Sequence, residues 1–208
     1  MTDWATIASL GTAAGTMVLA VATYASVRSS KRSALASERA LLAAIRPVLV
    51  SSRLEDPVEK IGFVDEHWVK VAGGRGVIEV TDDVIYLAIA LRNVGSGLAV
   101  LDRWDLHVDR PRDTSVVTDG FRRLTRDIYV PAGDHGFWQG ALRDPTDPMF
   151  AAVREAAAEN RAITIDLLYG DQEGGQRTVS RFGLLPVVDG QRIATVSRHW
   201  NLDRSDPR

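Results

Sequence analysis

The sequence contains no cysteine and very little lysine. The absence of Cys among its 208 residues excludes disulfide bonds, Cys-ligated zinc, iron–sulfur clusters and thiol catalysis. Lys occurs only at Lys31, Lys60 and Lys70, so Arg carries most of the positive charge. The formal net charge is -2 and the sequence pI is about 6.1. This balance lacks the basic excess of a nucleic-acid-binding domain, and we expect no nucleic-acid partner.

Charge is also missing from the N-terminal segment, which has no charged side chain between Trp4 and Val27. As a helix this run rises about 36 Å, which is enough to cross a hydrocarbon core of roughly 30 Å. Trp4 and Tyr24 stand near its two ends, where amphipathic aromatic rings favour the membrane interface. The sequence therefore predicts a transmembrane helix over residues 1–27 and the lipid bilayer as a partner.

The flanking charges predict an orientation for this helix. Arg28, Lys31 and Arg32 follow it at once, whereas the other flank carries Asp3 and the terminal amine. Positive charge is retained on the cytoplasmic side. The abundance of Arg, Ala, Val, Gly and Asp is typical of a high-GC bacterial genome. We expect a single-pass protein of the bacterial inner membrane, with the N-terminus outside and the C-terminal domain in the cytoplasm.

Two other interpretations of the apolar run remain open. A cleaved signal peptide could use Ala20-Val-Ala22 as its cleavage site, but no Lys or Arg precedes the run. The buried helix of a soluble protein would show a polar stripe with a period of 3.6 residues, whereas hydroxyl side chains are scattered around this one. A retained span is favoured over both.

Gly11 and Gly15 form a GxxxG pair within the apolar run. Small residues at this spacing let two helix backbones approach closely in lipid, so these glycines are candidate membrane-helix contacts. The alternative is that a run rich in Ala and Gly contains the pattern by chance.

The helical pattern continues beyond the apolar run. Leu35, Leu42 and Ile45 fall near one face, and charged residues occupy most of the rest. This indicates an amphipathic juxtamembrane helix over residues 28–46, ending before Pro47.

From Pro47 onward, short runs of β-branched residues separated by turns predict a β-sandwich domain over residues 47–200, with a flexible tail at 201–208. His67–Val71 and Gly76–Val80 suggest a hairpin, and Asp147 with Pro148 indicates the start of one short helix in which Phe150, Val153 and Ala157 share a face. The expected strands are 47–54, 67–71, 76–80, 84–92, 99–101, 104–108, 126–130, 135–139, 162–169, 177–182 and 191–198.

Two segments carry a resemblance to a known group of proteins. The stretch Ile89–Ala99 contains Arg-Asn-Val-Gly-Ser-Gly, and Tyr169–Phe182 contains Tyr-Gly-Asp-Gln-Glu-Gly. Both are similar to segments of uncharacterised bacterial membrane proteins in which one N-terminal span precedes an immunoglobulin-like sandwich. The resemblance implies that fold and topology, and it implies no activity.

The sequence contains few candidate residues for catalysis or metal binding. The four histidines lie far apart in the sequence, although Asp65-Glu66-His67 and Asp134-His135 could contribute metal ligands. Ser96 lacks the glycine two positions before it that a nucleophile elbow needs. We interpret acid pairs such as Asp102 and Asp105 as solvent-exposed residues of turns. We predict no catalytic residue, no metal and no cofactor, and hence a protein that is not an enzyme.

The tryptophans suggest where partners bind. Most of those in the β domain are expected to fill its core, with Trp138 and Trp200 as candidate exposed partner contacts. The expected function is a non-enzymatic interaction or assembly module at the cytoplasmic face, with self-association or a membrane protein as partner. The alternatives are an accessory subunit of a larger membrane complex for transport, secretion or defence, and an enzyme whose site is assembled from distant loops.

Overall fold

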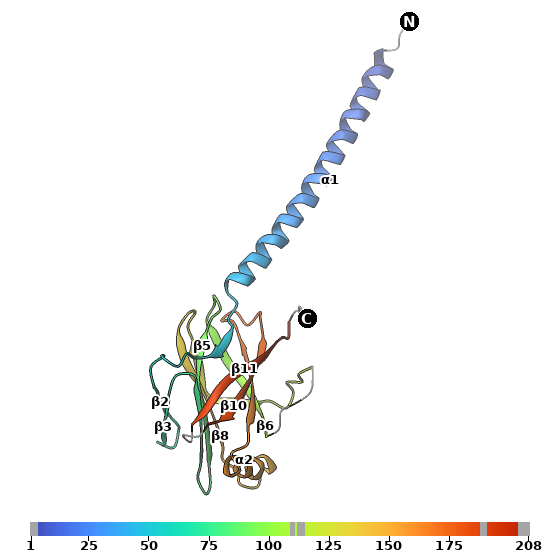
Figure 1. The fold of residues 1–208 in the computed structure, drawn as a ribbon. Helices are drawn as coiled ribbons and strands as arrows, with labels where there is room; N and C mark the ends of the chain where they lie inside the picture. The colour runs from blue at the N-terminus through green and yellow to red at the C-terminus, as the bar shows by residue number, and fades with distance from the viewer. Residues whose placement is uncertain (1–3, 109–110, 112–114, 188–190, 204–208) are drawn as a thin grey trace. The chain divides into compact units, whose positions relative to one another are not determined.

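The computed structural model describes the backbone of residues 4–108, 111, 115–187 and 191–203, and the side chains of these residues from Leu10 onward. The end of the predicted tail, residues 204–208, lies outside this range. The chain divides into two compact units, Met1–Ala43 and Ala44–Arg208. The first is helical and the second is the β domain (Figure 1).

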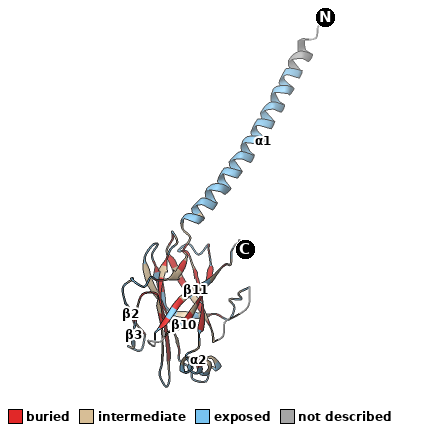
Figure 2. Cartoon of the chain, viewed as in Figure 1, coloured by how far each residue is buried: buried red, intermediate tan, exposed pale blue. Residues whose placement is uncertain are grey.

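Helix α1 runs without a break from Trp4 to Ala44, across the predicted boundary at residue 27. Its hydroxyl side chains bond to their own backbone: Thr16 Oγ1 donates to the carbonyl of Thr12 at 2.5 Å, and Thr23 Oγ1 to that of Leu19 at 2.7 Å. The helix therefore satisfies these polar groups internally. Every side chain from residue 10 to 41 is exposed (Figure 2). By length and composition, α1 could cross a membrane.

In the described residues of the β domain there are eleven strands and one helix. The strands are β1 (Leu49–Ser51), β2 (Glu59–Gly62), β3 (Trp68–Val71), β4 (Arg75–Val80), β5 (Ile85–Asn93), β6 (Ala99–His107), β7 (Arg122–Val130), β8 (His135–Leu142), β9 (Ile163–Gly170), β10 (Thr178–Pro186) and β11 (Arg192–Asn201); the helix is α2 (Pro148–Ala158).

Nine strands form one curled antiparallel sheet: eight follow the order β1-β5-β4-β11-β10-β9-β6-β7, and the ninth, β8, pairs with β5. Strand β8 pairs along one edge of β5, from Ile85 to Arg92, while β4 and β1 share the other edge. Strand β5 is therefore central, and eight of its nine residues are buried, as its apolar sequence predicts. The sheet curls so far that β7 and β8 contact each other.

Helix α2 lies at one end of the curled sheet (Figure 1). Asp147 caps it, since its side chain accepts a hydrogen bond from the amide of Met149 at 2.8 Å. The helix buries Phe150, Val153 and Ala156 in the main core; the expected third residue, Ala157, is only half-buried. The predicted start and type of this helix are confirmed.

The mainly β, antiparallel class is confirmed, but an immunoglobulin-like sandwich is not, because the second sheet consists of β2 and β3 alone. The predicted hairpin between residues 162–169 and 177–182 is present as β9 and β10. The predicted hairpin between residues 67–71 and 76–80 is wrong: β3 pairs with β2, and β4 pairs with β5 and β11. Strand β2 was not predicted.

Candidate functional site

Two of the tryptophans, Trp138 and Trp200, do not lie where the sequence suggested. Trp138 is completely buried and contacts the ring of Trp104 at 5.3 Å between centroids. Trp200 is also buried, and the guanidinium groups of Arg181 and Arg198 lie 4.7 and 5.0 Å from its ring centroid. Burial in the fold corrects the expectation that Trp138 and Trp200 are exposed contacts. Among the tryptophans with described side chains, only Trp68 is exposed, with 57% of its surface accessible.

Trp68 lies on the outer face of the small β2–β3 sheet. The register pairs Gly62 with Trp68, and the next pair on the same face is Lys60 with Lys70. The Trp68 ring covers Gly62 so closely that a Cβ atom there would lie 2.9 Å from it. The Lys60 ammonium group lies 4.8 Å from the ring centroid, within reach of a cation–π interaction. We call Lys60, Gly62, Trp68 and Lys70, with the turn residues Val64 and Glu66, the Trp68 face.

The inner face of the same hairpin fixes it to the β domain. Alternation along β2 and β3 directs Ile61, Val69 and Val71 inward, where all three are buried. They pack in a separate apolar cluster with residues of β5, including Tyr86 and Ala88. Because this cluster lies on the outer side of the main sheet, β5 is covered on both faces.

Polar contacts hold the turn end of the hairpin. Asp65 accepts hydrogen bonds from the Tyr86 hydroxyl at 2.5 Å and from Arg143 at 2.6 Å. The bond from Arg143 is the largest cause that lowers the pKa of Asp65 well below its ordinary value. His67 Nε2 lies 2.8 Å from a carboxylate oxygen of Glu79, and its ring stacks on Tyr86 at 4.0 Å. These contacts join the turn to β4, β5 and the end of β8.

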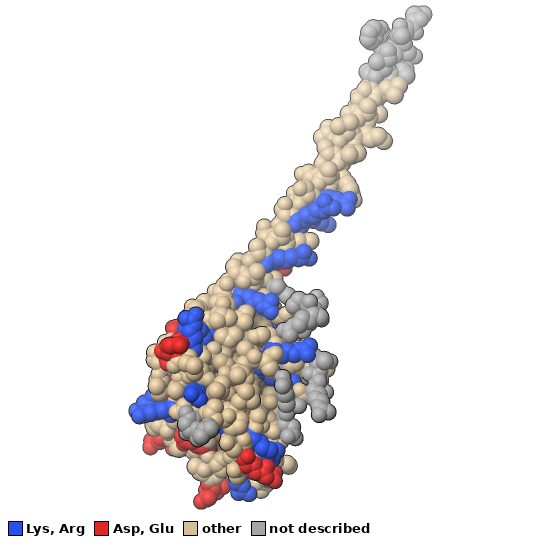
Figure 3. Space-filling view, viewed as in Figure 1, with Lys and Arg blue, Asp and Glu red and all other residues tan. Residues whose placement is uncertain are grey.

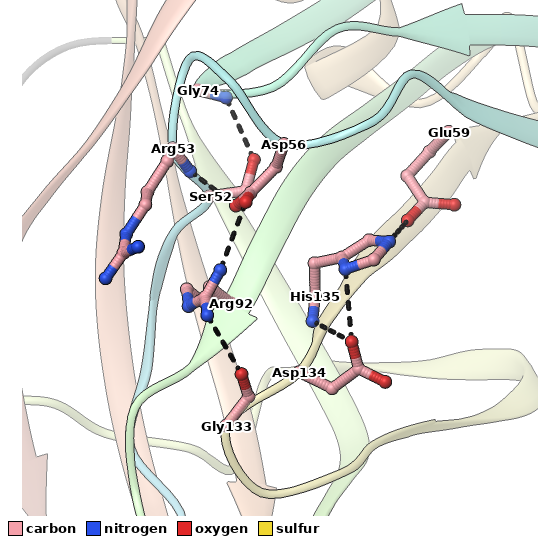
Figure 4. Close-up of polar contacts among 9 residues, drawn as sticks. All are labelled: Ser52, Arg53, Asp56, Glu59, Gly74, Arg92, Gly133, Asp134 and His135. Carbon is pink, nitrogen blue, oxygen red and sulfur yellow. Dashed lines mark hydrogen bonds and ion pairs between the residues drawn. The ribbon is translucent and has the colours of Figure 1, made fainter.

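A second set of polar contacts holds the segment that leads into β2 (Figure 4). Arg92 donates to Asp56 at 3.1 Å and to the carbonyl of Gly133 at 3.0 Å. The backbone amide of Arg53 and the nearby Arg92 lower the pKa of Asp56. His135 lies between Glu59 and Asp134, at 3.5 and 3.1 Å from their carboxylate oxygens. The hairpin is thus fixed at both ends and along its inner face, so the Trp68 face is a preformed surface.

The Trp68 face contains two locally unfavourable features. Lys60 and Lys70 lie directly opposite each other, and like charges in a cross-strand pair repel. Glu66 has a φ of 62°, the left-handed region that favours Gly or Asn. Both lysines and Glu66 are exposed, and within the described part of the chain none of them forms an ion pair. Neither the like-charged lysine pair nor the left-handed backbone of Glu66 stabilises the isolated hairpin.

A separate hollow of about 250 Å³ lies over β6, β9 and β10. At its base Arg181 forms a bidentate ion pair with Asp166, at 2.7 and 2.6 Å, and both side chains are almost completely buried. Burial raises the pKa of Asp166, but the bonds from Arg181 and His107 outweigh this and lower it overall. His107 Nε2 lies 3.3 Å from Asp166 and 3.5 Å from Asp105.

This hollow does not contain an assembled catalytic group among its described residues. Ser115 lines it, but no hydrogen bond joins Ser115 to His107. Both oxygens of Asp166 accept from Arg181, so the carboxylate serves the ion pair. Elsewhere in the described ranges no three His, Asp or Glu side chains are arranged to hold a metal. Asp65 and His67, considered as ligands from the sequence, instead bond to Arg143 and Glu79.

The Asn-Val-Gly-Ser-Gly segment has a structural role that the sequence did not reveal. Asn93 is completely buried; its Oδ1 accepts from the amides of Val48 and Gly95, and its Nδ2 donates to the carbonyls of Gly97 and Val130. A Cβ atom on Gly97 would lie 1.7 Å from the carbonyl oxygen of residue 45. The motif therefore fixes residues 45–48, the first segment of the β domain, against the turn after β5.

The candidate helix contacts Gly11 and Gly15 lie on the exposed surface of α1. A Cβ atom on either would meet nothing within 4 Å. No other side chain of α1 therefore fills the space beside them.

Comparisons with known proteins identify no family for this chain. No protein-family model matches the sequence, and no curated protein is similar enough to match it.

Proposed function

We propose that α1 anchors this protein in the bacterial inner membrane and that the β domain acts at the cytoplasmic face as a non-enzymatic interaction or assembly module. One observation carries the proposal: α1 exposes Met17, Val18 and Val21 at 64–72% of their surface. In water this apolar surface would be unfavourable, whereas in a bilayer it would be solvated by lipid.

The proposed orientation rests on the charges that follow the apolar part of the helix. Lys and Arg side chains first occur partway along α1, at Arg28, Lys31 and Arg32, and the described helix before them is uncharged (Figure 3). The positive-inside rule then supports a cytoplasmic β domain. The resemblance carried by residues 89–99 and 169–182, to bacterial single-span proteins with an immunoglobulin-like domain, belongs to the same proposal.

The Trp68 face supports an interaction role for the β domain. An exposed Trp on a rigid platform contributes a large contact area at little cost in conformational entropy, and Trp is enriched among residues that dominate binding energy. By contrast, the hollow beside His107 has its buried charges paired within the domain.

A second candidate role is that of an accessory subunit in a larger membrane complex. It is favoured by the open surface at Gly11 and Gly15, where another transmembrane helix could approach closely. A membrane oligomerisation reporter should lose signal on Gly15→Leu if the contact is with a second copy. A signal unchanged by this substitution would mean that the glycine pair does not join two copies of this chain.

Membrane extraction tests the anchor itself. The full chain should stay in the membrane pellet after washing at high pH, which removes peripheral proteins. Leu19→Arg, which places a charge in the apolar run, should shift much of the chain to the supernatant. Leu54→Arg, a substitution at an exposed residue of the β domain, is the matched control and should stay in the pellet. Complete release of the unmodified chain would contradict the proposal.

A further inference from the structure

The Trp68 face carries charges of both signs on the two sides of its tryptophan. The Lys60–Lys70 pair stands one step along the sheet from Gly62 and Trp68, at about 7 Å, since two residues of a strand rise about 3.3 Å each. Glu66 lies on the opposite side of Trp68, in the turn closed by the bond from the Phe63 amide to the His67 carbonyl. The order along the face is therefore basic, aromatic, acidic.

With this order of charges, the face is complementary to the same face of a second copy. A two-fold axis at Trp68 that runs parallel to the face and perpendicular to β2 and β3 turns a second copy face to face with the first and exchanges its basic and acidic ends. A second copy related by that axis brings its Glu66 opposite Lys60 and Lys70 of the first, and the reverse contact forms at the same time. Two-fold contacts of this kind use the same patch on both subunits and are the commonest in homo-oligomers.

We propose that the Trp68 face is a self-association surface, on which a second copy of this chain docks by a two-fold contact centred on Trp68. The second copy places a carboxylate between the two opposed ammonium groups, which removes their repulsion. It also gives Glu66 a partner, which accounts for a Glu at a turn position that favours Gly or Asn. One contact thus explains the exposed Trp, the opposed lysines and the unusual turn residue.

The size of the patch links this inference to the proposed function. Two strands of four residues each offer much less area than the roughly 800 Å² per partner of a stable dimer in solution. Anchoring by α1 confines the copies to one membrane and raises their effective concentration, which allows a small contact to be occupied. The inference therefore rests on the membrane anchor.

Charge-reversal substitutions in two differently tagged copies test the contact. The full chain is produced with two different tags in the same cells, extracted in mild detergent and captured through one tag; the amount of the other copy is measured. Lys60→Glu combined with Lys70→Glu should reduce co-capture at least tenfold, and so should Glu66→Lys. Co-expression of the lysine double variant with Glu66→Lys should restore it, because every contact across the two-fold axis is then between opposite charges.

Two further variants separate the contact from folding. Glu66→Asn suits the left-handed turn, so its urea midpoint should equal or exceed that of the unmodified chain while co-capture falls. Asp82→Lys, in the exposed turn between β4 and β5, is the control and should leave co-capture unchanged.

Several results would overturn the inference. The first is that the unmodified chain co-captures no second copy. The second is that the mixed pair of charge variants does not recover co-capture. The third is that co-capture is lost with the lysine variant but not with Glu66→Lys. The last pattern would indicate an acidic partner of another kind or an anionic lipid surface. Membrane pelleting of the same samples shows separately whether the anchor holds, so a failed anchor is distinguished from a failed contact.

Discussion

At the scale of single residues, buried polar groups in the β domain serve structure. Asn93 joins four backbone groups, and the Asp166–Arg181 pair lies beneath a hollow. In the sequence, Asn93 resembles any turn residue and Asp166 any acidic residue within a strand. The bonds of Asn93 to Val48 and Val130, and those of Asp166 to Arg181, join residues 15 or more positions apart, so local patterns could not identify these roles.

Removing one charge of the buried pair should destabilise the domain strongly. Asp166→Asn leaves the Arg181 guanidinium buried without its counter-charge, and we expect a loss of about 3–5 kcal/mol in the free energy of unfolding. Urea denaturation measures it. The control is Asp102→Asn, because the half-exposed Asp102 contacts Arg103 at 3.5 Å and should change stability by less than about 1 kcal/mol. Equal effects of the two substitutions would contradict the structural role of the buried pair.

At the scale of elements, local chemistry predicted α2 and most strands, whereas strand pairing was harder to predict. Asp147 and Pro148 are local signals for a helix start, and the apolar run at β5 indicates a strand covered on both faces. Strand β2 has only Ile61 as a buried apolar residue, flanked by Lys60 and Gly62, so its composition gives little strand signal. The loop at residues 72–75 looked like a hairpin turn, but there the chain passes from β3 in the small sheet to β4 in the main sheet.

The N-cap of α2 should contribute measurably to stability. Asp147→Ala removes the bond to the Met149 amide and the ion pair with Arg122 at 2.8 Å, and should cost about 1 kcal/mol. Glu155→Ala, on the exposed side of the same helix, should change the free energy of unfolding by less than half as much. Chemical denaturation of both variants checks this, and a cost for Asp147→Ala no larger than for Glu155→Ala would refute the cap.

The first segment of the β domain should depend on Asn93. In Asn93→Ala the amide of Val48 loses its acceptor, which lies at 3.1 Å, and its hydrogen exchange should accelerate at least tenfold relative to the unmodified chain. The amide of Leu49 bonds instead to the Tyr169 hydroxyl, also at 3.1 Å, and provides an internal control whose exchange should change much less. Unchanged exchange at Val48 would show that Asn93 does not hold this segment.

At the scale of the whole molecule, paired carboxylates should make the β domain sensitive to acid. Hydrogen bonds lower the pKa values of Asp56, Asp65, Asp147 and Asp166 in the folded state. A folded-state pKa below the unfolded value of about 3.9 contributes stability that is present above that pH and lost as the pH falls. The free energy of unfolding should therefore decrease below about pH 4, and Asp65→Asn should flatten that decrease. An equally steep decrease in the variant would contradict the role of Asp65.

The sequence predicted the organisation of the whole chain more fully than it predicted the candidate site. Charge distribution along α1 is a local property, so an apolar helix followed by basic residues was visible without coordinates. Which tryptophan is exposed depends on how strands pair and curl. Trp138 faces the main core, whereas Trp68 lies on the outer side of a hairpin whose first strand was not predicted.

Protease protection in intact cells tests the proposed anchor and its orientation most directly. With a tag after the C-terminus, the account predicts that protease added outside the inner membrane leaves the β domain and the tag intact, and that both are digested once the membrane is permeabilised. The chain should also remain in the membrane fraction. Digestion of the tag before permeabilisation, or recovery of the chain in the soluble fraction, would contradict a cytoplasmic domain held by a membrane-spanning α1.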